Sequence, residues 1–99
     1  MTIVAVTACP TGIAHTYMAA EQLEKTAKAL GHRIKVETQG AMGIENELSQ
    51  QEIREADLIV FAVDIEVEKQ ERFEGMKIVR VPVREAIANP RGIFEKTPA

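Results

Sequence analysis

The sequence predicts an α/β fold: an open sheet of four parallel strands with helices on both faces, which makes three layers. The main observation is that short runs of β-branched and apolar residues alternate along the chain with segments of helical periodicity. A second observation is residues 58–63, which are apolar throughout, as expected for a strand buried on both faces. Right-handed crossovers between such strands give the order 2-1-3-4.

Each element carries a local signal. The long helix stops at Gly31, Ser49 and Glu52 form a capping box at the start of the second helix, and Pro82 ends the last strand. The strands are expected at residues 3–7, 33–38, 58–63 and 77–81, the helices at 13–30, 50–55, 66–74 and from 83 to 88, and a glycine-containing loop at 39–46.

Length and composition limit the function. The 99 residues fit a single domain, residues 1–99, and we expect it to be a monomer by itself. A net charge of −3 provides no basic surface for nucleic acid, and no apolar run is long enough to insert into a membrane, so a cytoplasmic location is expected. One cysteine makes neither an internal disulfide nor a thiolate zinc site, and the sequence predicts no metal and no cofactor.

That cysteine, Cys9, lies between the first predicted strand and the first predicted helix. A lone cysteine is most often an inert buried side chain. Here, however, the strand order reverses at this position, and ligands of open α/β sheets bind at such a point. The start of a helix also favours a thiolate and binds anions. We expect Pro10 to stiffen the turn. We expect a bound phosphate to accept hydrogen bonds from the backbone N–H groups of residues 11–14 (Thr11, Gly12, Ile13, Ala14) and from the hydroxyls of Thr11 and Thr16.

His15 follows Cys9 with five residues between them, and Thr16 comes next. Protein tyrosine phosphatases have the same spacing, but an arginine occupies the position of His15. Because an arginine clamps a phosphoryl group and promotes its transfer to water, its absence favours a carrier over a phosphatase-like hydrolase. Two interpretations of His15 remain open at this point, a phosphate contact or a residue on the helix surface.

Three further residues follow other strands at the same edge of the sheet. Gln39 and Gly40 either line the site or belong to a connecting loop. Asp64 ends the third predicted strand, where it is either a general acid or, more commonly, a strand terminator.

Residues 7–20, which contain the run Cys-Pro-Thr-Gly-Ile-Ala-His-Thr, resemble the phosphocysteine loop of fructose-type enzyme IIB components of the bacterial sugar phosphotransferase system. Later segments match further motifs of that family, and the resemblance covers nearly the whole chain. These segments are Val-Glu-Thr-Gln-Gly at 36–40, followed by Gly43, Glu45, Asn46 and Leu48, then Ala56-Asp57, Asp64-Ile65 and Arg-Phe-Glu-Gly at 72–75.

The resemblance implies that Cys9 accepts a phosphoryl group from a phosphohistidine of enzyme IIA. The phosphocysteine then donates it to a fructose-type sugar held by the membrane permease, enzyme IIC, with residues 10–16 as the phosphate loop. It also implies a location at the inner face of the membrane, through enzyme IIC. A tyrosine-phosphatase-like hydrolase and a regulatory module that only senses phosphorylation are the alternatives. The sequence leaves open the sugar, and whether the domain is free-standing or fused to other components.

Overall fold

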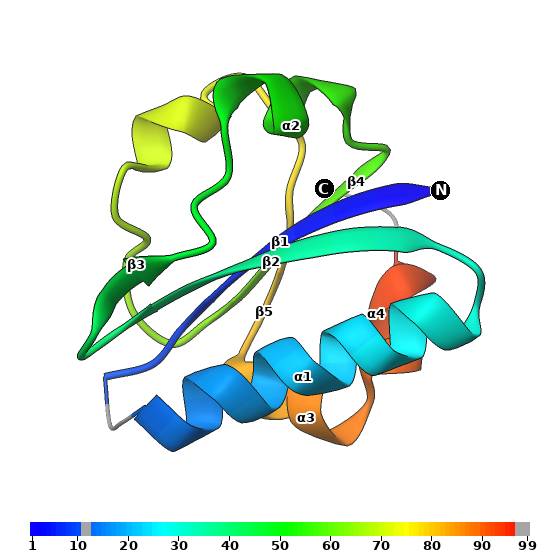
Figure 1. Ribbon diagram of the computed structural model, residues 1–99, viewed down its shortest axis with the longest axis horizontal. Helices are drawn as coiled ribbons and strands as arrows, with labels where there is room; N and C mark the ends of the chain where they lie inside the picture. Colours follow the sequence, from blue (N-terminus) through cyan, green and yellow to red (C-terminus); the bar gives the residue numbers. More distant parts are fainter. Residues whose placement is uncertain (11–12, 97–99) are drawn as a thin grey trace.

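The computed structural model describes residues 1–10 and 13–96, apart from the side chain of residue 13. Its strands are β1 (Thr2–Ala8), β2 (Arg33–Gly40), β3 (Gly43–Glu45), β4 (Leu58–Val63) and β5 (Val79–Val81). Its helices are α1 (Ile13–Ala29), α2 (Gln50–Glu55), α3 (Val83–Ala88) and α4 (Pro90–Phe94), with a 3-10 helix, η1 (Gln70–Phe73). Figure 1 shows the sheet between α1, α3 and α4 on one side and α2 on the other.

The strand order is β3-β2-β1-β4-β5. Strands β2, β1, β4 and β5 pair in parallel, which confirms the predicted order of the four parallel strands. The prediction of a four-stranded, all-parallel sheet was wrong, however, because β3 adds a fifth strand antiparallel to β2.

Strand β3 arises within the predicted loop at 39–46. Gly40 pairs with Gly43, so only Ala41 and Met42 form the turn, and Gly43 adopts a left-handed φ of 85°. Neither turn residue belongs to the Asn-Gly type that marks a two-residue hairpin in a sequence. With only three residues, β3 also carries too little alternation to be recognised, which explains the error.

Two apolar clusters lie on opposite faces of the sheet. On one face, odd-numbered residues of β1, such as Ile3 and Ala5, pack with buried residues of α1, α3 and α4. On the other face, Val4 and Val6 pack with Ile53 of α2 and with Phe61 and other residues. Phe61 contacts Phe73 edge to face, with ring centroids 4.8 Å apart. The segment after β4 is therefore part of the core.

That segment is less helical than predicted. A helix was expected over residues 66–74, but only η1 forms, preceded by Lys69 with a left-handed φ of 57°. Val67 and Phe73 are buried, so the segment is anchored by side chains rather than by a regular helix. Throughout residues 1–10 and 13–96, no helix has both the length and the apolar character that crossing a bilayer requires.

Candidate functional site

Cys9 follows β1 directly, at the carboxyl end of the central strands. In the sheet register, Ala8 pairs with Gln39 of β2 and with Val63 of β4, so the ends of three parallel strands meet beside Cys9. The Cys9 side chain is only 7% exposed and packs against the apolar cluster under α1. The structure therefore places Cys9 at the predicted switch point, and a ligand must reach it from this edge of the sheet.

A pocket of about 270 Å³ opens onto Cys9. Three segments form it: the end of β1, the turn between β2 and β3, and the chain that follows β4. Its lining residues are Cys9, Pro10, Gln39, Gly40, Ala41, Ile65, Glu66 and Glu68. The pocket thus brings together Cys9, Pro10, Gln39 and Gly40, four residues that sequence reasoning had grouped.

Gln39 is 2% exposed and braces one wall of this pocket. Its Nε2 donates to the backbone oxygen of Glu68 at 3.1 Å, and its Oε1 accepts from the backbone N–H of Glu68 at 2.8 Å. The side chain thus ties the end of β2 to the irregular segment after β4. Gln39 thus lines the pocket and joins two segments around it, and a part in the chemistry stays a prediction.

A buried ion pair lies behind Gln39, and sequence reasoning missed it. Arg72 donates to both carboxylate oxygens of Glu37, at 2.7 and 2.9 Å, and Glu37 is fully buried. Burial by itself would raise the pKa of Glu37, but hydrogen bonds from Arg72, from the backbone N–H of Leu48 and from Gln39 lower it overall. Hydrogen bonding to Glu37 raises the pKa of Arg72. The available signal was that both residues lie inside the motifs at 36–40 and 72–75.

The predicted phosphate loop is described only in part. Thr11 and Gly12 lie outside the described residues, as does the side chain of Ile13. Ala14 and His15 are exposed on the first turn of α1. The hydroxyl of Thr16 is buried and has no hydrogen-bond partner among the described residues, while its backbone oxygen accepts from Thr7 Oγ1 at 3.2 Å. Phosphate binding by this loop stays a prediction.

Asp64 has a structural contact of its own. Its Oδ1 accepts from the backbone N–H of Val83 at 3.2 Å, at the start of α3. Its backbone N–H donates to the oxygen of Ala8 at 2.9 Å, which extends the pairing of β1 with β4. These contacts agree with the strand-terminator interpretation, and a part in the chemistry stays a prediction.

The same sequence pattern is found in known proteins. Residues 4–96 match the family model described as "PTS system, Lactose/Cellobiose specific IIB subunit". The chain belongs to the IIB components of the sugar phosphotransferase system. The "PTS system fructose-like EIIB component 2" of Escherichia coli K12 is 50% identical over 97 residues, which cover 98% of this chain and 92% of that protein. The resemblance to fructose-type IIB components is therefore confirmed.

Two further relatives of this IIB chain extend the comparison. The "PTS system fructose-specific EIIABC component" of Bacillus subtilis is 53% identical over 94 residues, which cover 95% of this chain and 15% of that longer protein. A solved domain of fruA from Bacillus subtilis superposes with a TM-score of 0.89 at 50% identity, covering 97% of this chain and 91% of that one. These matches give the chain a phosphotransferase role and do not favour the hydrolase alternative.

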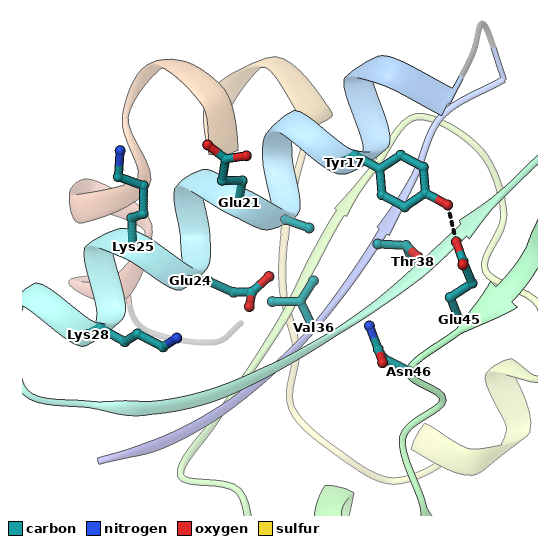
Figure 2. Close-up of a pocket in the computed structure, with 10 residues that line it drawn as sticks. Tyr17, Glu21, Glu24, Lys25, Lys28, Val36, Thr38, Glu45 and Asn46 are labelled. Atoms are coloured by element: carbon teal, nitrogen blue, oxygen red, sulfur yellow. Dashed lines mark hydrogen bonds between the residues drawn. The ribbon is translucent and has the colours of Figure 1, made fainter.

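A second, larger hollow of about 460 Å³ lies between α1 and the β2–β3 hairpin. Figure 2 shows acidic and basic side chains of α1 on one side and Thr38, Glu45 and Asn46 on the other. Tyr17 donates a hydrogen bond to a carboxylate oxygen of Glu45 across one end of it. Cys9 is not among its lining residues. This hollow is the larger of the two, but Cys9 lines the smaller one.

We predict that Tyr17 ionises at higher pH than an ordinary tyrosine. Its hydrogen bond to Glu45 stabilises the neutral phenol and raises its pKa above the usual 10.0. The chain has one tyrosine and no tryptophan, so the ultraviolet absorbance of tyrosinate reports on Tyr17 alone. In an absorbance titration, Glu45→Ala should return the midpoint towards 10, because alanine offers the phenol neither a hydrogen-bond acceptor nor a charge. An unchanged midpoint in Glu45→Ala would contradict the contact.

Proposed function

We propose that this IIB chain carries the phosphoryl group on Cys9 as a phosphocysteine. In the first step the Cys9 thiolate sulfur attacks phosphorus, an S–P bond forms, and the P–N bond to a histidine of a IIA component breaks. In the second step a sugar hydroxyl oxygen attacks the same phosphorus, the S–P bond breaks and the hydroxyl proton is released. The observation that carries the proposal is the position of Cys9, the single cysteine, in a pocket at the ends of β1, β2 and β4.

The lining of the pocket suits a carrier. Among the described residues that line it, none is cationic, and two, Glu66 and Glu68, are acidic. Arg72 is held by Glu37 rather than directed at Cys9. A phosphoryl group on Cys9 would therefore lack the fixed arginine clamp that a phosphatase uses to stabilise transfer to water. Weak stabilisation of the phosphoryl group on Cys9 favours its transfer to the next acceptor. We propose that the backbone N–H groups of residues 11–14 bind the phosphoryl group until then.

The domain composition of relatives supports a proposal for the two partners of this chain. The names "EIIABC component" in Bacillus subtilis and "EIIBC component" in Escherichia coli describe IIB segments joined to A and C components. We therefore propose a IIA component as donor and a membrane-embedded IIC component, with its bound sugar, as acceptor. Residues 1–99 would then act as one IIB domain at the inner face of the membrane.

We propose a fructose-type sugar as the acceptor. Support comes from the fructose-like and fructose-specific names of relatives that are 50% and 53% identical. The choice is not set by overall identity, since a "2-O-alpha-mannosyl-D-glycerate-specific" relative from Escherichia coli is 46% identical. The sugar is best identified by supplying the IIC permease and measuring which radiolabelled sugar becomes phosphorylated.

The decisive test is intact-mass spectrometry after incubation with phosphorylated IIA. We expect one added phosphoryl group, located on Cys9 by peptide mapping under conditions that preserve phosphocysteine, and no addition to Cys9→Ser. A phosphoryl group on His15 would contradict the proposal. As a second readout, the chain should hydrolyse p-nitrophenyl phosphate at a negligible rate, and rapid turnover would instead support the hydrolase.

A further inference from the structure

We infer that Glu37, Gln39 and Arg72 form a positioning network for phosphoryl transfer, which fixes the wall of the Cys9 pocket at residues 65–68. The inference rests on the proposed function of Cys9. None of the three side chains needs to contact the phosphoryl group. They act through the backbone of Glu68, which lines the pocket together with Cys9.

The first step concerns Glu37, whose four hydrogen bonds occupy both carboxylate oxygens. Oε1 accepts from Arg72 Nη1 at 2.7 Å and from the backbone N–H of Leu48 at 2.8 Å. Oε2 accepts from Arg72 Nη2 at 2.9 Å and from Gln39 Nε2 at 2.6 Å. A buried ion pair is a weak source of stability compared with apolar residues of similar volume. Because both oxygens of Glu37 nevertheless have all their hydrogen bonds made, the pair points to a need for fixed geometry around Glu37.

The second step leads from the ion pair to the pocket wall. The backbone oxygen of Glu68 accepts from both Gln39 Nε2 and Arg72 Nη2, each at 3.1 Å, and Arg72 Nε donates to the oxygen of Lys69 at 2.8 Å. The chain here lies outside any strand or α-helix, and Lys69 has a left-handed φ. Side chains, rather than the hydrogen bonds of the sheet, therefore set the distance between this wall and Cys9.

The third step is chemical. In-line attack on phosphorus needs reacting atoms placed within a few tenths of an ångström, and a displacement of about 1 Å can slow a reaction about 100-fold. The wall also carries the acidic residues Glu66 and Glu68 beside Cys9. If the wall moved inwards, it would bring negative charge towards the phosphoryl group, and if it moved outwards, it would open the pocket. We therefore expect the network to affect the transfer step itself.

Gln39→Leu is the main test, because it removes both contacts with Glu68 and one hydrogen bond to Glu37 but leaves the two hydrogen bonds between Arg72 and Glu37 in place. We expect single-turnover transfer from phosphorylated IIA at saturating donor to slow about 10- to 100-fold. The half-saturating donor concentration should stay unchanged, since Gln39 is only 2% exposed and offers no surface to a partner. Arg72→Lys keeps the charge but loses the bidentate contact with Glu37, so it should slow transfer by a similar factor.

The matched control is Lys35→Met, on the same strand and the same face. Lys35 pairs with Glu52 at 2.9 Å and ties β2 to α2, away from the Cys9 end. Its variant should transfer at the wild-type rate. All variants are compared at a temperature where circular dichroism shows each to be folded. If Lys35→Met and Gln39→Leu slow transfer equally, or if Gln39→Leu transfers at the wild-type rate, the inference is wrong.

Two readouts do not depend on phosphoryl transfer. In Gln39→Leu the backbone N–H of Glu68 loses its acceptor, so its hydrogen exchange should accelerate about fivefold. Alkylation of Cys9 by iodoacetamide should also become faster, because a looser wall exposes a thiol that is now 7% exposed. If these two changes occur but Cys9 never receives a phosphoryl group, the network is supported and the proposed function fails. If neither changes, the network fails, whatever the outcome for Cys9.

Discussion

Replacing Cys9 with serine is expected to lower phosphorylation of the sugar by at least about 1000-fold in an assay that supplies IIA, IIC and a phosphoryl donor. The reason is chemical. A thiol is partly ionised near neutral pH and its thiolate is a strong nucleophile, whereas a serine hydroxyl stays protonated without an adjacent general base. The measurement is the initial rate of formation of radiolabelled sugar phosphate at saturating sugar.

The fold of the variants has to be checked separately, because Cys9 packs in an apolar cluster. A serine hydroxyl buried there costs about 1–3 kcal/mol if it finds no partner. Cys9→Ala adds no polar group and so avoids this cost. Because it also lacks the thiol, it should be as inactive as Cys9→Ser. If either variant is folded and retains a tenth of the wild-type rate, Cys9 is not the carrier.

Much of the fold was predictable because each parallel strand has its own local signal. The apolar run of β4 and the β-branched run of β1 are typical of strands covered on both faces, and the crossovers then determine their order. Strand β3 was missed because pairing of three residues depends on a turn, at Ala41 and Met42, whose sequence is not typical of hairpins.

The position of Cys9 was predictable for the same reason, since it depends only on the strand order and the end of β1. Glu37 and Arg72 were not predictable in this way. Alternation places Lys35 and Glu37 on the same face of β2, yet Lys35 is partly exposed and Glu37 is fully buried. What distinguishes them is the segment after β4, which covers Glu37 only once the chain has folded. Residues 66–74 were expected to form a helix, but the segment is irregular apart from η1, and Phe73 anchors it in the core.

Breaking the Glu37–Arg72 pair is expected to cost about 3–5 kcal/mol of the free energy of unfolding, the usual cost of leaving a buried charge without its partner. Glu37→Ala and Arg72→Met should each show this loss in urea denaturation. The double variant Glu37→Leu/Arg72→Met should lose much less than the sum of the single changes, because no unpaired charge remains buried. Lys35→Met, which breaks an exposed pair, should cost only about 0.2–1 kcal/mol.

The pair should also make stability depend on pH in a defined direction. The folded-state pKa of Glu37 lies below its ordinary value of 4.5, so the folded protein binds this proton less readily than the unfolded chain does. The stabilisation from Glu37 is therefore complete above about pH 4.5 and is lost as the pH falls through the folded-state pKa. In Glu37→Leu/Arg72→Met this part of the acid-induced loss should disappear. If the double variant keeps the full acid sensitivity of the wild type, other carboxylates account for it. If, in addition, the single variants lose less than about 1 kcal/mol, the two side chains do not form the buried pair in solution.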